Sequence, residues 1–251
     1  MTSLEKPIVY LVLGAAGSGR REVLADLLED GLAEGNQAAV LLEEREAADA
    51  AEARLTRVER WAWREGMIVG TLPAGTTRIF FVTDGRGSPV DQIEVFKAWV
   101  EAQGGGLARV LCIINCQLAE RNPPLLAWYE ACVHFADVVL LNRREGVANK
   151  WLSDFLTHFK KQYYPCLFEL VKGGQVRNPA LVLEPQARRM SHLFDEELDL
   201  IFSDSEGDEI DEQEETDGDE EIEATPEEDP YLARRNGGRR VKELPDIAKF
   251  L

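Results

Sequence analysis

Cysteine and histidine are scarce in this chain, which holds four cysteines and three histidines among its 251 residues. The first cysteine is Cys112, and each lies in or beside an apolar stretch. Because no apolar signal segment follows a basic N-terminus, we expect buried free thiols in a reducing, cytoplasmic setting rather than disulfides. Neither Cys112 with Cys116 nor Cys132 with His134 makes a pattern strong enough to predict a metal site.

Long apolar runs are also lacking, because no stretch of about 18 apolar residues occurs, and this excludes a membrane-spanning helix. Lys and Arg are absent from residues 195–229, which hold 20 Asp and Glu. The net charge of −18 is therefore concentrated in that stretch, while residues 1–194 carry −2 and residues 230–251 carry +4. Such a stretch would repel phosphate, so we expect no nucleic-acid partner.

What is abundant is an alternation of short apolar runs with helical patterns. The apolar runs predict strands at 7–13, 38–42, 78–83, 108–115, 137–142 and 166–170. Helices are predicted near 20–34, 45–65, 89–103, 122–134 and 147–163. Continuous apolar strands are typical of sheets covered on both faces. We therefore predict an α/β fold of three layers, with a mostly parallel sheet of the P-loop NTPase type between helices.

The chain divides into three predicted parts. Residues 1–190 form the P-loop domain, 191–229 an acidic disordered linker, and 230–251 a basic and apolar C-terminal segment. The linker has too few apolar residues to bury a core. Two roles are open for the C-terminal segment. It either binds a protein partner at the end of a tether or covers a groove on its own domain.

The glycine-rich turn at residues 14–21 is the most informative motif. It reads G-A-A-G-S-G-R-R, where a P-loop reads G-x-x-x-x-G-K-S/T. Gly14, Gly17, Ser18 and Gly19 keep the turn that cradles phosphate at a helix N-terminus. Arg20 and Arg21 replace the lysine that reaches the β- and γ-phosphates and the hydroxyl that holds Mg²⁺. We expect the cradle to remain while hydrolysis is very slow or absent.

Two further motifs follow predicted strands. Asp84 and Gly87 have the D-x-x-G form of the GTPase element that organises the metal and the γ-phosphate, although Asp84 could instead make an Asx-turn, and G-R-G-S-P offers a second alignment. Asn142 and Glu145, in N-R-R-E, have the shape of the guanine-binding N-K-x-D motif. An ordinary charged loop is the other interpretation of this sequence. If nucleotide binds, we expect it over residues 14–21, with Asn142 and Glu145 near the base.

In this order the motifs resemble the CobW/HypB/UreG group of P-loop GTPases, and CobW-type metallochaperones most of all, over residues 7–172. The resemblance implies GTP or another nucleotide as ligand and leaves a need for Mg²⁺ open. It does not extend to the C-x-C-C metal motif or to the C-terminal domain of that family, so no metal site is implied.

We therefore expect a nucleotide-binding or pseudo-GTPase regulator or adaptor, with no catalytic residue assigned and a protein partner bound through the C-terminal tail. A slow active GTPase and a scaffold that binds no nucleotide are the alternatives.

Overall fold

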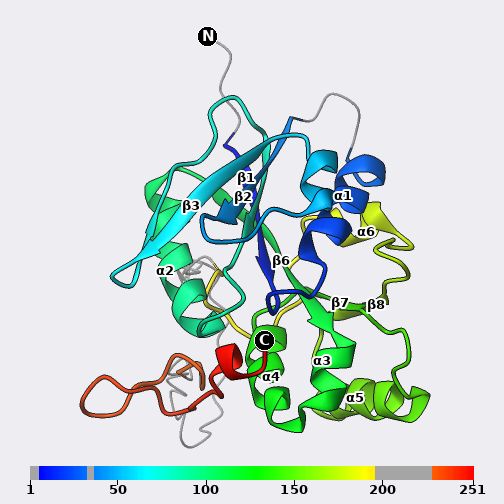
Figure 1. Cartoon of the computed structure of the whole chain (residues 1–251). Helices are drawn as coiled ribbons and strands as arrows, with labels where there is room; N and C mark the ends of the chain where they lie inside the picture. Colours follow the sequence, from blue (N-terminus) through cyan, green and yellow to red (C-terminus); the bar gives the residue numbers. More distant parts are fainter. Residues whose placement is uncertain (1–5, 33–36, 196–227) are drawn as a thin grey trace, which may run out of the picture.

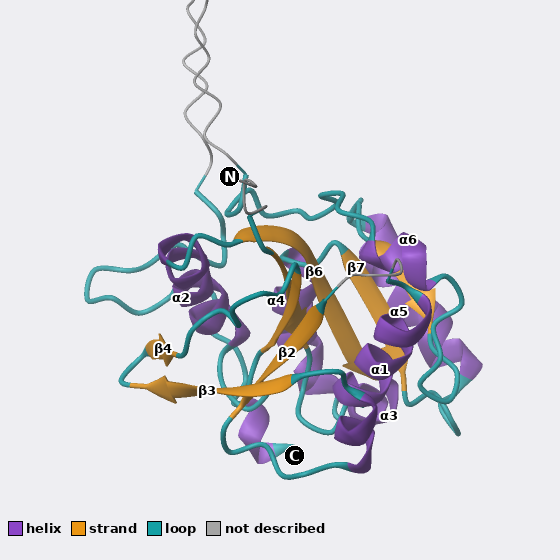
Figure 2. Cartoon of the chain, turned by 90° about the horizontal axis from the view of Figure 1, so that it is seen from above, coloured by secondary structure: helices purple, strands orange, loops and turns teal. Residues whose placement is uncertain are grey.

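The computed structural model describes residues 6–32, 37–195 and 228–251, and the predicted linker lies mostly outside them. An eight-stranded sheet with the order β4-β3-β2-β5-β1-β6-β7-β8 forms its centre (Figures 1 and 2). The strands are β1 (Ile8–Leu13), β2 (Ala38–Glu43), β3 (Val58–Arg64), β4 (Met67–Val69), β5 (Arg78–Val82), β6 (Gly106–Asn115), β7 (Val138–Asn142) and β8 (Leu167–Leu170). All neighbouring pairs are parallel except β3 with β4.

Helices cover both faces of the sheet, because alternate side chains of the apolar strands point to opposite sides. Val9 and Leu11 of β1 face one core with helices α2 (Pro89–Ala102), α4 (Leu126–His134) and α5 (Asn149–Lys161). Tyr10 and Val12 face a second core with α1 (Arg20–Asp30) and α6 (Pro179–Leu183). The predicted three-layer α/β fold with a mostly parallel sheet is confirmed.

The central strand β1 is where the strand order reverses. Its neighbours are β5 on one side and β6 on the other, and both run parallel to it. Ligands of open α/β sheets bind at such a reversal, outside the carboxyl ends of the strands. The glycine-rich turn leaves β1 at this point and leads into α1, so it occupies the position of a phosphate-binding loop.

The helix predicted at 45–65 is wrong. Only Ala50–Arg54 are helical there, as a short 3-10 turn, while Val58–Arg64 form β3 beside β2. The alanines at 47–53 favoured a helix, but the following V-E-R-W-A-W-R pairs with the sheet and buries Trp61. The ring centroids of Trp61 and Phe81 lie 4.6 Å apart, and the Trp61 indole N–H donates to the Val82 carbonyl at 3.0 Å. Tertiary packing overrides local propensity at this edge.

The predicted helix at 122–134 is shorter than expected and has a neighbour that was not predicted. Cys116–Arg121 form α3, Pro123–Leu125 make a 3-10 turn, and α4 begins at Leu126. The two prolines interrupt the helical hydrogen bonding between α3 and α4, because proline has no backbone N–H to donate. The other predicted helices and strands lie within a few residues of the observed ones.

Of the two roles left open for residues 230–251, the structure has the segment covering its own domain (Figure 1, orange and red). Tyr231 is 3% exposed and Ile247 1% exposed, and both belong to the core that lies under α2 and α4. Packing also begins before the predicted boundary at 230, because Asp229 contacts His134 and Ser191. Within the described residues, no helix is both long and apolar enough to cross a membrane.

Candidate nucleotide-binding site

The backbone of the glycine-rich loop has the conformation that its sequence predicts. Gly14, Gly17 and Gly19 have φ values of 135°, 76° and 81°, which side chains with a Cβ rarely adopt. A Cβ on Gly14 would lie 2.3 Å from the Ile113 carbonyl oxygen of β6. On Gly85, in the next loop, it would lie 2.5 Å from the Gly14 carbonyl oxygen. Glycine is therefore required both for the turn and for the close approach of its neighbours.

Neighbouring strands hold this loop in place. The Ala16 amide donates to the Gly85 carbonyl at 2.9 Å, and the Ser18 amide donates to Ala15 at 3.1 Å. Asn142, at the end of β7, donates from its side-chain amide to the Ser18 carbonyl at 2.9 Å. The buried Ser18 hydroxyl has no hydrogen-bond partner among the described residues. Two backbone amides of the loop are therefore already used inside the protein.

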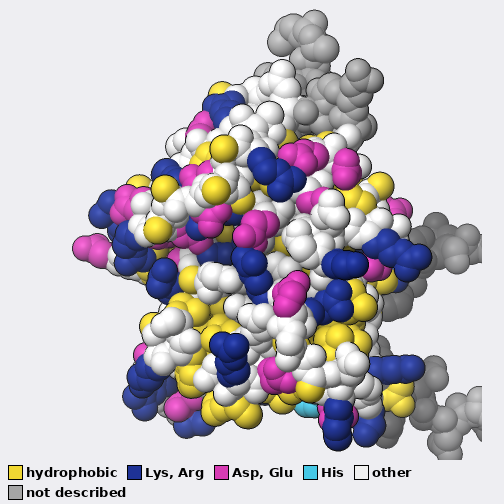
Figure 3. Space-filling model, turned by 45° about the vertical axis from the view of Figure 1, so that its right-hand side comes forward, with side chains coloured by type: hydrophobic (Ala, Val, Ile, Leu, Met, Phe, Trp, Pro, Cys, Tyr) yellow, Lys and Arg dark blue, Asp and Glu magenta, His cyan; other side chains and the backbone are white. Residues whose placement is uncertain are grey.

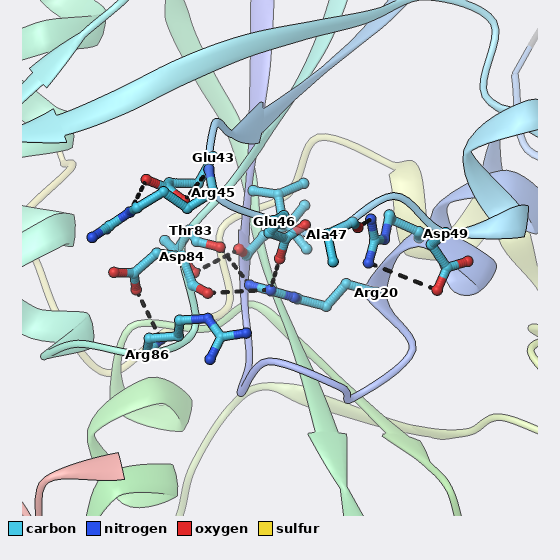
Figure 4. Close-up of polar contacts among 12 residues, drawn as sticks. Arg20, Glu43, Arg45, Glu46, Ala47, Asp49, Thr83, Asp84 and Arg86 are labelled. Carbon is cyan, nitrogen blue, oxygen red and sulfur yellow. Dashed lines mark hydrogen bonds and ion pairs between the residues drawn. The ribbon is translucent and has the colours of Figure 1, made fainter. Parts of the chain in front are cut away.

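Arg20 takes the position of the P-loop lysine, but its side chain is not free to meet a phosphate (Figure 4). It is 4% exposed, and its guanidinium pairs with Glu46, which is 8% exposed. It also donates to the Thr83 carbonyl and, at 3.4 Å, to the Asp84 carbonyl. Burial lowers the pKa of Arg20, while Glu46 and Asp84 oppose that change. The planar guanidinium is therefore held by acceptors of the protein on two of its nitrogens.

Two other arginines near the loop, Arg21 in α1 and Arg143 after β7, are paired as well. Arg21 donates to Glu52 at 2.5 Å and to the Ala47 carbonyl at 2.6 Å. Arg143 contacts both carboxylate oxygens of Glu22, at 2.7 and 2.8 Å. The cavity that these groups line has a volume of about 60 Å³, whereas ligand pockets usually reach about 300–1,000 Å³. This cavity is small, and the positive charge of its arginines is neutralised by carboxylates of the protein itself.

Asp84 makes the Asx-turn that the sequence left as an alternative. Its Oδ1 accepts from the amides of Arg86 at 2.9 Å and Gly87 at 3.1 Å, and from the Gln92 side chain at 2.6 Å. Asp84 is 6% exposed, so this carboxylate shapes the turn before α2. A larger cavity of about 280 Å³ lies beside it, lined in part by Trp63 and Arg86.

The two residues predicted to recognise the base differ in their exposure to solvent. Asn142 is 3% exposed and fixed beneath the glycine-rich loop. Glu145 is exposed in the loop after β7, and its backbone carbonyl accepts from the Gln117 side chain at 2.6 Å. Recognition of guanine by these two residues stays a prediction.

Acidic and basic side chains line the cavity at the glycine-rich loop in equal numbers. On the face drawn in Figure 3, basic and acidic side chains are interspersed. Within the described residues, no group of three or more His, Cys, Asp or Glu is arranged to hold a metal ion. The four cysteines are buried, and burial raises the pKa of both Cys116 and Cys166 to about 12, which keeps these two thiols protonated.

Sequence reasoning missed the carboxylates that fill this site. Glu46 falls in the segment wrongly predicted as helix, and Glu22 is an ordinary first-turn residue of α1. The replacement of lysine by Arg20 was the available signal, because a buried guanidinium needs an anion. The position of that anion depends on the loop after β2, which no motif marks.

The solved structures that are similar to this chain include two of the YjiA GTPase. One is the Zn(II)-bound YjiA GTPase from E. coli, with 14% identity and a TM-score of 0.42. The other is a Zn(II)-bound triple mutant of the YjiA GTPase, with 15% identity and a TM-score of 0.45. Each alignment covers 74% of this chain and 67% of the other. No protein-family model and no curated protein sequence matches the chain.

Proposed function

We propose that this chain is a CobW-like pseudo-GTPase, a regulator or adaptor built on a P-loop domain that does not hydrolyse GTP efficiently. The observation that carries the proposal is the buried ion pair between Arg20, at the end of the glycine-rich loop, and Glu46. A nucleotide would need the β- and γ-phosphates stabilised at this position, where the lysine of a P-loop acts as a mobile point charge. Here the cation is already bound to Glu46 and to two backbone carbonyls.

Electrostatics also disfavour a tightly bound triphosphate. Glu22, Glu46 and Asp49 line the cavity together with Arg20, Arg21 and Arg143. Since each arginine already has a carboxylate partner, an incoming phosphate must displace those carboxylates or lie beside them. We expect nucleotide affinity to be weak and to require opening of the Arg20–Glu46 pair.

Mg²⁺ has no hydroxyl ligand at the position after Arg20. Arg21 occupies it and would repel a divalent cation, while its own guanidinium is bound by Glu52 and Ala47. Mg²⁺ prefers oxygen ligands in near-octahedral geometry. Phosphoryl transfer depends on that metal for positioning and charge neutralisation, so turnover should be very slow or absent.

The test is calorimetric titration of the purified full chain with GTP, GDP, ATP and ADP, with and without Mg²⁺, together with measured phosphate release. We expect weak binding without strong dependence on Mg²⁺, and no turnover above the rate without protein. Restoring the motif with Arg20→Lys and Arg21→Thr together should raise Mg²⁺-dependent nucleotide affinity. Adding Glu46→Gln to this pair should raise the affinity further, because the new lysine then has no competing carboxylate.

Gly19→Val is the matched negative control. A Cβ at Gly19 would lie 2.4 Å from the Asn142 side-chain nitrogen and 2.4 Å from Glu22, and the φ of 81° disfavours valine. This change should abolish any binding that the restored variants gain. If the unmodified protein instead hydrolyses GTP at an ordinary GTPase rate and Gly19→Val abolishes that activity, the chain is an active GTPase and the proposal fails.

A scaffold that binds no nucleotide is the second candidate, favoured by the cavity of only about 60 Å³. The restored variants distinguish it from the first. If neither the natural chain nor the double variant with Arg20→Lys and Arg21→Thr binds any nucleotide while remaining folded, the loop serves packing alone.

A further inference from the structure

Residues 229–251 lie against the domain through a few side-chain anchors. Asp229 begins the segment, with its Oδ2 2.9 Å from His134 Nε2 and 2.5 Å from the Ser191 hydroxyl. Tyr231 follows, with its ring centroid 4.8 Å from that of His134 and 6.2 Å from that of Phe135. Near the C-terminus, Ile247 is the second fully buried side chain of the segment.

The backbone of this segment is self-contained. All of its backbone–backbone hydrogen bonds to described residues join residues of the segment itself, such as Val241 to Ala233 and Leu232 to Asp229. By contrast, the amides of Met190 and Ser191 donate to the His134 carbonyl at 3.1 and 3.2 Å. The chain up to Ser191 is thus tied to the domain through its backbone, whereas the segment after residue 228 is held by side chains, as a docked peptide is.

Charge complementarity fixes the orientation of the segment on α2. Arg240 contacts Asp91 at 2.6 Å and Glu94 at 2.7 Å, and Arg234 contacts Glu94 at 2.6 Å. Within the segment, the Lys242 ammonium lies 4.0 Å from the Tyr231 ring centroid, and Arg240 donates to the Tyr231 carbonyl. The α2–α4 face therefore presents two acidic side chains and an apolar contact surface. The segment supplies the arginines and the aromatic ring that match them.

We propose that the α2–α4 face is a peptide-binding site, that residues 229–251 are its ligand within the same chain, and that a partner peptide displaces them. The partner has the chemistry of the resident ligand, with a carboxylate and an aromatic anchor followed by arginines. A resident ligand on the same chain raises the affinity that a partner must have, because its effective concentration is high. This inference does not depend on nucleotide, so it stands or falls separately from the proposed pseudo-GTPase.

The experiment uses the full chain with a protease site inserted within residues 196–227, cut after folding. A fluorescent synthetic peptide of residues 228–251 is then added, and its binding is followed by anisotropy. We expect the cut fragment to stay with the domain in gel filtration and to exchange with the labelled peptide. Before cutting, the same peptide should bind at least about tenfold more weakly, because the tethered segment competes.

Peptide variants distinguish specific recognition from nonspecific binding. Tyr231→Ala should lower peptide affinity at least about tenfold, because it removes the aromatic ring from the apolar contact surface. Arg240→Glu should lower it about five- to tenfold, since it places like charges together. Arg235→Glu is the matched control, because among the described residues the Arg235 side chain bonds only within the segment, to the Val241 carbonyl. Replacing Asp91 alone by arginine in the protein should restore part of the binding of the Arg240→Glu peptide, because Glu94 keeps its contact with Arg234.

Two results would overturn the proposal. One is a cut protein in which the fragment never exchanges while the domain stays folded by circular dichroism, since the segment would then be a permanent part of the core. The other is equal binding of the Arg240→Glu and Arg235→Glu peptides. Formation of dimers by the uncut chain, concentration-dependent and abolished by Tyr231→Ala, would assign the site to a second copy instead of a partner.

Discussion

Two sites of this molecule are filled by the chain itself, and they are filled in different ways. At the glycine-rich loop, Arg20 and its partner Glu46 are both nearly inaccessible, and the arginine also satisfies two backbone carbonyls. On the α2–α4 face, a segment from the far end of the chain is held by two buried side chains and by ion pairs whose acidic members are exposed.

The difference lies in what removal of the occupant leaves behind. A buried charge without its partner is costly, whereas an exposed carboxylate returns to water at little cost. The Arg20–Glu46 pair should therefore resist opening, and the α2–α4 face should open more readily. Four measurements test this contrast.

The largest effect is expected from Arg20→Ala. Glu46 would be left buried and unpaired, together with the Thr83 carbonyl, so we expect a loss of about 3–5 kcal/mol in the free energy of unfolding. Urea denaturation measures it. Arg54→Ala is the matched control, because the Arg54–Glu29 pair is exposed and should contribute about 0–1 kcal/mol. Equal losses in the two variants would show that the loop pair is not anchored as its burial implies.

Removing residues 196–251 should have the next largest effect. The α2–α4 face loses Tyr231 and Ile247, each worth about 1.5–3 kcal/mol of burial, partly offset by the cost of closing the loop that precedes them. We expect the melting temperature to fall by about 5–10 °C. A segment that served only as a free tethered ligand, the other role considered from the sequence, would leave the melting temperature nearly unchanged. An unchanged melting temperature would mean that the segment does not stabilise the domain.

A pH dependence should follow from Asp229. Burial alone would raise the pKa of this carboxyl, but hydrogen bonds from His134, Ser191 and the Tyr231 amide lower it to about 2. A depressed pKa stabilises the folded protein above the ordinary value of 3.8, and this contribution disappears as the pH falls from about 4 to about 2.

The contribution is about 2 kcal/mol at pH 5, read as the difference between the natural chain and Asp229→Asn in urea unfolding. The difference should shrink steadily between pH 4 and pH 2. A difference that stays constant across this range would show that Asp229 does not act through its charge.

The smallest effect is expected from deleting half of residues 196–227 while keeping the C-terminal segment. The charge of these residues predicts a disordered loop, and each halving of such a loop lowers its closure cost by about 0.6 kcal/mol, so we expect stability to rise by that amount. Calorimetric melting of the two forms measures it. A fall in stability would instead show that these residues carry structure of their own, against the expectation of disorder from their charge.

Much of this architecture could be predicted from the sequence. Continuous apolar runs such as I-V-Y-L-V-L predict buried parallel strands, and the glycines at 14, 17 and 19 predict the turn after β1. The edge formed by β3 and β4 could not be predicted, because alanines nearby favour a helix and only pairing with β2 decides the outcome. Local propensity carries no information about that pairing.

The candidate site shows the same limit. Arg20 was identified from its place in a motif, but its partner Glu46 comes from an unmarked loop 26 residues away. Likewise, the C-terminal segment could be recognised as apolar and basic, yet only packing against His134 and α2 distinguishes a self-bound segment from a free one. Contacts between distant parts of the chain, rather than residue types, decide both cases.

The buried Arg20–Glu46 pair also bears on how such a chain can evolve. A single change at either position leaves a poorly accommodated partner, so each residue keeps the other in place. A lysine at position 20 would lose its competing carboxylate only if position 46 had changed too, and the change at position 46 alone would leave a buried guanidinium without its carboxylate partner. The pair is therefore expected to resist replacement by single substitutions and to change only when both positions change together.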